Sequence, residues 1–326
     1  IIIENSPEYI ISYFGIQKAG GISVAINPQC STYELKRIFN NCLPDILVVE
    51  GKSLKPILEI IAEGTSLKTI IVNSLSNEEL RSFLNRNGKF PSDIKFYTLR
   101  SVLRNNDINN TYPLIDKKHI ASIIYTSGTT GEPKGVTLSH DNFVTNANSI
   151  IEYLKLTQTD RVMVVLPFYY SYGMSLLTTH ILVGGSLILE NSFMYPNVIL
   201  NKMVKEEVTG FAGVPSTFAI LLNRSNIRKY RFPKLRYVTQ AGGAMSPKHA
   251  RELAEVLSGT DIYIMYGQTE ATARLTYLDP KDLLRKPGSI GRAIPGVKVE
   301  LVKNNGMLAE VGEAGEIVAQ GGNVMI

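Results

Sequence analysis

A loop rich in glycine and hydroxyl side chains is the first feature of this 326-residue sequence that could do chemistry. It reads YTSGTTGEPKG over residues 125–135 and follows an apolar run typical of a buried strand. Its glycines let backbone amides converge on an anion, its hydroxyls donate hydrogen bonds, and its lysine supplies positive charge. The candidate phosphate ligands are Thr126, Ser127, Gly128, Thr129, Thr130, Gly131 and Lys134. The spacing matches neither a Walker loop nor a GxGxxG fingerprint, so a phosphate loop of another kind is expected.

Two later turns are also candidates for a binding role: QAGGAM at 240–245 and YGQTEAT at 266–272. The first exposes backbone with little side chain, and the second offers a flat aromatic face. Taken alone, each turn could equally be an ordinary connection after a strand.

These motifs resemble blocks of the adenylate-forming superfamily, which includes acyl- and aryl-CoA synthetases, beetle luciferases and the adenylation domains of peptide synthetases. The three motifs stand in the order that this family requires. The segments GSIGRAIPGVKVELV (288–302) and GEAGEIVAQGGNVM (312–325) resemble its next two blocks. The resemblance therefore covers nearly the whole chain.

The resemblance implies a reaction. Members of the family make an acyl adenylate from a carboxylic acid and ATP, with release of pyrophosphate, and many then transfer the acyl group to CoA or to the pantetheine of a carrier protein. It implies ATP and Mg²⁺ as cofactors, with Glu270 as the metal ligand and Thr269 bonded to the α-phosphate. It also implies an adenine site, on whose Tyr266 ring the purine could stack, made by Gly242, Gly243, Ala244, Tyr266 and Gly267. The residues expected to act in catalysis are Thr126, Lys134, Thr269 and Glu270.

The acid pocket is expected near LPFYYSYG (166–173), which resembles the block where CoA ligases carry an aromatic or histidine gate. The candidate pocket residues are Tyr170, Ser171, Gly173 and Val214. Tyr169, Tyr170, Tyr172 and Met174 of this region could equally be plain core. No Asp or Glu occurs from Pro167 to Leu189, so an amino-acid substrate would lack a counter-charge for its ammonium group. A hydrophobic acid, fatty or aryl, is favoured by the small apolar residues of segment 210–222.

Composition excludes several other classes. The formal net charge is only +5, and no run of five like charges occurs, which argues against a dedicated nucleic-acid binder. The two cysteines lack CxxC spacing, so neither a disulfide framework nor a zinc site is supported, and a reducing cytoplasm is expected. The four histidines lack metal-ligand spacing, and no GxSxG motif is present. The uncharged stretch from Val162 to Leu189 is interrupted by proline and glycine, which favours a buried strand, helix and strand over a membrane span.

The elements that position these residues alternate between apolar runs and segments of helical period, which predicts an α/β fold with buried parallel strands. Ten strands are expected, at residues 22–27, 45–50, 68–73, 94–99, 121–127, 161–168, 185–190, 210–215, 235–243 and 261–267. They predict two packed, mostly parallel sheets covered by helices, followed by a β-rich subdomain of distorted-barrel type. The predicted subdomains are 1–155 with the phosphate loop, 156–275 with the acid pocket and adenine site, and 276–326.

Both ends of the chain read as interior to a longer protein. The family's ribose-binding Asp, its hinge Arg and the C-terminal lid domain with its Lys would lie beyond residue 326, and an upstream unit would precede residue 1. The chain alone is therefore expected to adenylate poorly. Two alternatives stay open: an adenylating enzyme that loads only a carrier protein, and an inactive nucleotide-binding module.

Overall fold

The computed structural model describes residues 1–87, 91–104, 112–127 and 133–326. The described chain separates into two compact units, Ile1–Val136 and Thr137–Ile326. Each unit has its own apolar core, so each is a packed body in its own right.

The first unit contains two small sheets, with strand orders β2-β3-β4 and β1-β5-β6. Strands β2, β3 and β4 are parallel, as are β1 and β5. The helices are α1 (Pro7–Lys18), α2 (Thr32–Cys42), α3 (Leu54–Glu63), α4 (Asn77–Asn87) and α5 (Leu99–Arg104). The strands are β1 (Ser23–Ala25), β2 (Ile46–Glu50), β3 (Thr69–Asn73), β4 (Lys95–Thr98), β5 (Ile120–Ser127) and β6 (Pro133–Ser139), the last of which runs into the second unit.

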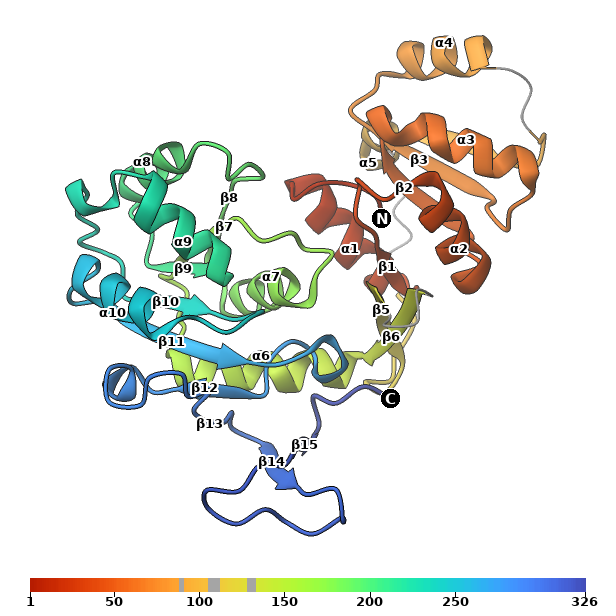
Figure 1. Ribbon diagram of the computed structural model, residues 1–326. Helices are drawn as coiled ribbons and strands as arrows, with labels where there is room; N and C mark the ends of the chain where they lie inside the picture. The colour runs from red at the N-terminus through yellow and green to blue at the C-terminus, as the bar shows by residue number, and fades with distance from the viewer. Residues whose placement is uncertain (88–90, 105–111, 128–132) are drawn as a thin grey trace. The chain divides into compact units, whose positions relative to one another are not determined.

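Local sequence explains where the first helices begin. Ser6 caps α1, with proline at the first helical position, and Ser31 and Glu34 form a reciprocal capping box at the start of α2. The apolar faces of α2 and α3 bury residues such as Phe39 and Ile57 against the β2-β3-β4 sheet (Figure 1).

The second unit is built on a seven-stranded sheet of order β13-β12-β11-β10-β9-β7-β8. Its helices are α6 (His140–Leu154), α7 (Ser171–Val183), α8 (Pro196–Lys205), α9 (Pro215–Arg224) and α10 (Pro247–Val256). Its strands are β7 (Arg161–Val164), β8 (Ser186–Leu189), β9 (Gly210–Gly213), β10 (Tyr237–Gln240), β11 (Asp261–Tyr266), β12 (Thr276–Leu278) and β13 (Arg292–Ala293). Strands β7 to β11 are parallel, and β12 and β13 add antiparallel pairs at one edge.

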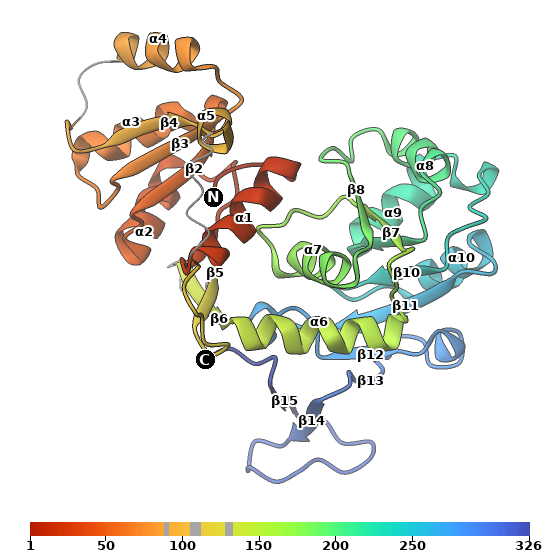
Figure 2. The same ribbon diagram turned by 180° about the vertical axis from the view of Figure 1, so that it is seen from behind.

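Helices cover both faces of this sheet (Figures 1 and 2). Helices α8, α9 and α10 share a core with one face, around Phe211 and Phe218. Helix α6 and residues of α7 share a second core, around Tyr153 and Tyr237. The connection from β7 through α7 leads to β8, on one side of β7. The next connection, from β8 through α8, leads to β9 on the other side of β7, so the direction in which strands are added reverses at β7. Open α/β sheets bind ligands at such reversals, beyond the carboxyl ends of the strands.

An antiparallel hairpin of β14 (Val297–Val302) and β15 (Glu316–Gly321) follows the sheet. Residues after β15 return to α6, where the Asn142 side-chain amide donates hydrogen bonds to the carbonyl oxygens of Gly322 and Val324. These bonds fasten the end of the described chain to the second unit.

The predicted mixed α/β architecture with mostly parallel sheets is confirmed, and each of the ten predicted strands overlaps an observed one. The strands of the described residues divide among four sheets. The unit boundary precedes α6, whereas the sequence placed that helix with the first subdomain. Helix α6 belongs to the second unit because it packs against α7 and because Asn146 donates to the backbone oxygen of Arg274.

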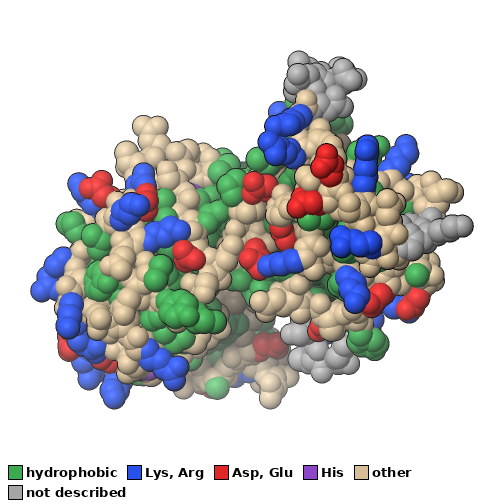
Figure 3. Space-filling view, turned by 90° about the horizontal axis from the view of Figure 1, so that it is seen from above, with side chains coloured by type: hydrophobic (Ala, Val, Ile, Leu, Met, Phe, Trp, Pro, Cys, Tyr) green, Lys and Arg blue, Asp and Glu red, His purple; other side chains and the backbone are tan. Residues whose placement is uncertain are grey.

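The uncharged stretch from Val162 to Leu189 folds as β7, α7 and β8, as predicted. Within the described residues, no helix combines the length and the apolar character that crossing a bilayer requires. On the face drawn in Figure 3, Lys and Arg side chains are interspersed with acidic and hydrophobic ones.

Candidate active site

The candidate site residues of the second unit gather at the carboxyl edge of its sheet. Strands β9, β10 and β11 are parallel neighbours, so the segments that follow them emerge at the same edge. Those segments begin at Val214, Ala241 and Gly267. Three of the sequence motifs are thereby brought together although they lie far apart in the chain.

An apolar cavity of about 460 Å³ lies at this edge. It brings together the five candidate adenine-binding residues, which the sequence drew from two separate motifs. Its lining includes Gly242, Gly243, Ala244, Tyr266 and Gly267, together with Met245, Ala250, Ile264, Met265, Leu278, Leu283, Gly288, Ser289 and Ile290. A cavity of this size and apolar character suits a flat heterocycle held between backbone and an aromatic side chain.

Glycine is needed at two places in this cavity wall. Gly242 has a φ of +80°, and a Cβ there would lie 3.2 Å from the Val214 side chain, so the turn after β10 rests against the start of α9. At Gly267 a Cβ would lie 1.9 Å from the carbonyl oxygen of Ala273, a distance that no side chain can occupy. The backbone approach at both glycines shapes the cavity.

Thr269 and Glu270 lie on a short 3₁₀ turn, Thr269–Ala271, that follows β11. The Thr269 and Ser171 hydroxyl oxygens are 3.3 Å apart, which joins the β11 turn to the first residue of α7. Both side chains are half-buried. The geometry therefore places one predicted catalytic residue beside one predicted acid-pocket residue.

The turn has an unusual backbone geometry and is held by partners distant in the chain. Thr272 and Ala273 have φ values of +52° and +89°, in the left-handed region that non-glycine residues rarely adopt. The backbone oxygen of Glu270 accepts a hydrogen bond from the Met325 amide at 2.8 Å. The Asn323 side chain donates to the backbone oxygens of Ala271 and Arg274, at 3.0 and 3.1 Å.

The remaining acid-pocket candidates lie on or next to α7 and α9. Tyr170 precedes α7, is 53% exposed, and its ring centroid lies 4.6 Å from that of Tyr169. Gly173 is buried, and a Cβ there would lie 2.0 Å from the Pro167 carbonyl oxygen, so the first turn of α7 packs tightly on the chain leaving β7. Val214 is half-buried and precedes α9. The exposure of Tyr170 shows that this ring is not plain core.

The described residues of the predicted phosphate loop belong to the first unit. Thr126 is half-buried near the end of β5, and Lys134 is exposed near the start of β6. Residues Gly128, Thr129, Thr130 and Gly131, and the side chain of Ser127, lie outside the described residues.

Among the described residues, no three His, Cys, Asp or Glu side chains form a cluster that could bind a metal ion. Mg²⁺ in nucleotide sites needs only one or two protein carboxylates, since the phosphates and water supply the other ligands. Glu270 offers one carboxylate of this kind.

Several polar residues of this region were missed in the sequence. Gln240 is fully buried at the end of β10; its Nε2 donates to the Gly243 carbonyl at 2.8 Å, while its Oε1 has no partner. Asn323 and Arg274 are buried and also keep one unpartnered atom each, Oδ1 and Nε. Their positions in the QAGGAM and GGNVM blocks and just after YGQTEAT were the available signal.

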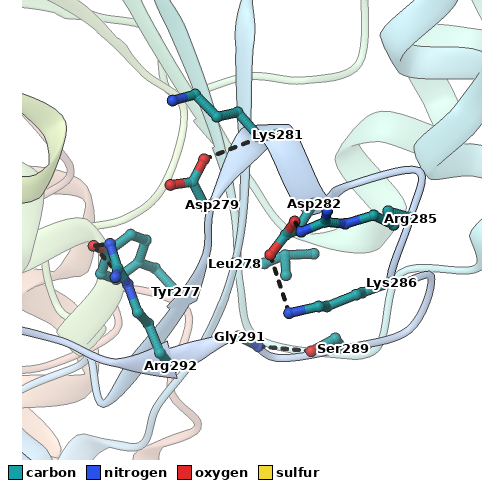
Figure 4. Close-up of a pocket in the computed structure, with 10 residues that line it drawn as sticks. All are labelled: Tyr277, Leu278, Asp279, Lys281, Asp282, Arg285, Lys286, Ser289, Gly291 and Arg292. Carbon is teal, nitrogen blue, oxygen red and sulfur yellow. Dashed lines mark hydrogen bonds and ion pairs between the residues drawn. The ribbon is translucent and has the colours of Figure 1, made fainter.

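A second, more polar cavity of about 500 Å³ adjoins the first and shares Leu278 and Ser289 with it (Figure 4). Asp282 pairs with both Arg285 and Lys286 there. The Arg292 guanidinium donates to the Tyr277 hydroxyl at 2.8 Å. These pairings account for most of the charge in the cavity.

Comparison with known proteins decides the family. The model of the AMP-binding enzyme family matches residues 1–326. This chain belongs to the AMP-binding enzyme family. Curated proteins similar to this chain include the indoleacetate–CoA ligase of Aromatoleum aromaticum, 26% identical over 98% of this chain and 59% of that protein. They also include the long-chain-fatty-acid–CoA ligase of Bacillus subtilis (strain 168), 27% identical over 100% of this chain and 60% of that protein.

Solved structures of CoA ligases share the fold. An anthranilate CoA ligase, AuaEII, in complex with anthranoyl-AMP superposes with a TM-score of 0.85 at 23% identity, over 99% of this chain and 60% of that one. The chain thus spans about 60% of the length of the family members that it matches. The expected N-terminal-domain fold of adenylate-forming enzymes is confirmed.

Proposed function

We propose that the protein activates a non-amino carboxylic acid with ATP, giving an acyl adenylate and pyrophosphate, and then forms a thioester with CoA. The observation that carries this proposal is the apolar cavity that unites Gly242–Ala244 with Tyr266 and Gly267 beside Thr269 and Glu270. It offers a purine site next to a hydroxyl and a carboxylate. The names of the relatives, CoA ligases for an aryl acetate and for long-chain fatty acids, support the same reaction class.

In this proposal the acid and ATP are held for in-line attack of a carboxylate oxygen on the α-phosphorus, with the bond to the pyrophosphate oxygen breaking. Tyr266 and the glycine turn would hold adenine, and the Thr269 hydroxyl would donate a hydrogen bond to the α-phosphate. Thr126 and Lys134, with the loop between them, would bind the β- and γ-phosphates. Glu270 would hold Mg²⁺, which supplies charge stabilisation to the departing pyrophosphate.

The proposed acid is uncharged apart from its carboxylate. Tyr170 and Ser171 belong to the segment from Pro167 to Leu189, which contains no Asp or Glu. An α-ammonium group held by this segment would lack a counter-charge from it, which argues against amino acids.

The test is acid-dependent exchange of pyrophosphate into ATP by the full-length protein, with a panel of fatty, aryl and short-chain acids. We expect exchange with at least one hydrophobic acid and slower exchange by residues 1–326 alone. Absence of exchange with every acid, together with tight ATP binding, would favour the inactive nucleotide-binding module. Thioester formation with free CoA distinguishes a CoA ligase from an enzyme that loads only a carrier protein.

A further inference from the structure

Arg274 is a charged residue in the interior of the second unit, where arginine is rare. Only 1% of its surface is exposed, and it is among the largest fully buried side chains of the described chain. Within the described residues, no carboxylate lies within ion-pair distance of its guanidinium. Arginine stays protonated in proteins, so the described part of the chain supplies no counter-ion for this buried positive charge.

The partners of this guanidinium come from three different elements. Nη1 donates to the Tyr153 hydroxyl of α6 at 2.8 Å and approaches the Met265 sulfur of β11 at 3.3 Å. Nη2 donates to Ser175 Oγ of α7 at 3.2 Å, and the guanidinium lies over the Tyr172 ring. One side chain thus ties α6, α7 and β11 together.

The backbone of Arg274 ends the turn that carries Thr269 and Glu270. The two residues before it, Thr272 and Ala273, have left-handed backbone conformations. A strained turn persists only when its surroundings hold it. Asn323 holds the backbone of this turn on one side, through Ala271 and the Arg274 carbonyl.

The buried guanidinium is not the group that would stabilise the fold most at this position. An apolar side chain of similar length would fill the same space without the desolvation of an unpaired charge, and the Nε atom lacks any hydrogen-bond partner. Its directional bonds do what an apolar side chain could not, since Nη2 joins the end of the turn to Ser175 of α7. The Thr269 and Ser171 hydroxyls, 3.3 Å apart, join the same two elements.

We propose that Arg274 is a positioning residue that locks the Glu270 turn to α7. It keeps Thr269 and Glu270 in place relative to Ser171 while the acid and ATP react. This inference rests on the proposed function, because the turn matters for adenylation only if these residues bind ATP and its metal.

The test compares Arg274→Met and Arg274→Lys in the full-length protein. For Arg274→Met we expect the kcat of pyrophosphate exchange to fall about tenfold to a hundredfold, as for a small misplacement of catalytic groups. The Mg²⁺ concentration for half-maximal rate should rise about fivefold, and Arg274→Lys should recover part of both losses. The KM for the acid should change little.

Hydrogen exchange supplies a readout that does not depend on activity. In Arg274→Met the amides of residues 271–273, each bonded to a carbonyl of residue 268 or 269, should exchange about tenfold faster, while those of β9 stay unchanged. Arg236→Met is the matched control: it removes a guanidinium bonded to Asp160, and should lower stability without altering the Mg²⁺ requirement. If Arg274→Met fails to fold, Tyr153→Phe removes only one partner hydroxyl, and should raise the Mg²⁺ requirement and speed amide exchange in the turn in the same direction.

Unchanged Mg²⁺ dependence and unchanged amide exchange in Arg274→Met would overturn the proposal, as would faster exchange spread evenly over the whole second unit. Failure of the proposed function gives a different result. The wild-type protein would then exchange no pyrophosphate with any acid, while the amide-exchange comparison would still show whether Arg274 holds the turn.

Discussion

The two ends of the seven-stranded sheet are built on opposite principles. At the amino ends of β7, β9 and β10, the residues Asp160, Thr209 and Arg236 bond to one another: Thr209 Oγ1 donates to Asp160 at 2.7 Å, and Arg236 Nη2 donates to both carboxylate oxygens at 2.7 and 2.8 Å. At the carboxyl ends the chain makes glycine turns, two left-handed non-glycine residues and an apolar cavity.

Unpartnered buried atoms occur at one end and not at the other. Among the described residues of the second unit, the buried side-chain atoms without a hydrogen-bond partner belong to Gln240, Arg274 and Asn323, all at or near the carboxyl edge. The carboxylate of Asp160, only 1% exposed, is fully satisfied. Buried polar atoms normally have hydrogen-bond partners. A group of buried atoms without partners therefore lowers stability, as functional sites often do. The hydrogen bonds at the amino end favour stability, and the proposed function places its chemistry at the carboxyl end.

The largest expected effect is at the carboxyl end. Glu270→Ala should reduce Mg²⁺-dependent adenylation by about a hundredfold to a thousandfold, since one lost charge-stabilising group costs that much in a transition state. The thermal midpoint should stay within a few degrees of the wild type. Pyrophosphate exchange and thermal unfolding of the full-length protein measure both, with the exposed Glu255→Ala on α10 as control. Near-normal turnover would mean that Glu270 is not the metal ligand.

The reverse pattern is expected at the amino end. Asp160→Asn removes the charge that pairs with Arg236 and should lower the free energy of unfolding by about 3 kcal/mol. Activity at low temperature should remain within about twofold of the wild type, because no site residue lies there. Asp45→Asn is the control, because its ion pair with Lys68 is exposed, and it should lower the free energy of unfolding by less than about 1 kcal/mol. Urea titration measures the free energy of unfolding of both variants. A large loss of kcat in folded Asp160→Asn would break the comparison.

The pH dependence of stability tests His180, a buried residue of α7. Burial lowers the pKa of His180 to about 4, whereas its ordinary value is 6.5. Between these pH values the unfolded chain binds a proton that the folded chain refuses, so stability should fall as the pH decreases from 6.5 to 4, by up to about 3 kcal/mol.

Replacement of the histidine isolates this contribution. His180→Gln should remove that part of the pH dependence of unfolding, while the contributions of the carboxyl groups remain in both proteins. Urea titrations of the two proteins at several pH values measure the difference. Parallel stability curves for wild type and variant would show that His180 is not held neutral by burial.

The smallest effect concerns the cavity wall. Tyr266→Ala should weaken ATP binding by roughly 1 kcal/mol, about a fivefold rise in KM for ATP, because aromatic stacking on adenine is lost. The kcat should change less. Tyr195→Ala, whose ring is 67% exposed just before α8, is the control and should leave KM unchanged. An unchanged KM in Tyr266→Ala would place adenine elsewhere.

Much of the fold could be predicted from the sequence because parallel strands are buried on both faces and therefore form continuous apolar runs. Strands β9 and β10 show this directly, with every residue buried. Helix starts were predictable from Ser6, Ser31 and Ser139, since each caps through its own side chain. Strand β6 was missed because its sequence, PKGVTLS, contains proline, glycine and lysine, which are depleted in strands.

The site was predictable only where a motif carries its own chemistry. Gly242, Tyr266 and Glu270 stand in recognisable turns, and the structure brings the turns together at one edge. Arg274 and Asn323 lie beside or inside marked sequence blocks, but their roles depend on partners distant in the chain, which the sequence does not show. The catalytic and binding roles of all these residues remain predictions.

The long-range contacts of helix α6 affect the order in which parts of the protein fold. Its side chains bond to backbone 128 residues away at Arg274, 146 away at Pro295 and up to 182 away at Val324. Closing such long loops is entropically costly, so contacts of this kind form after the local strand and helix units. We therefore expect the sheet to assemble first, and the turn that carries Glu270 to be completed only after Asn323 bonds to its backbone.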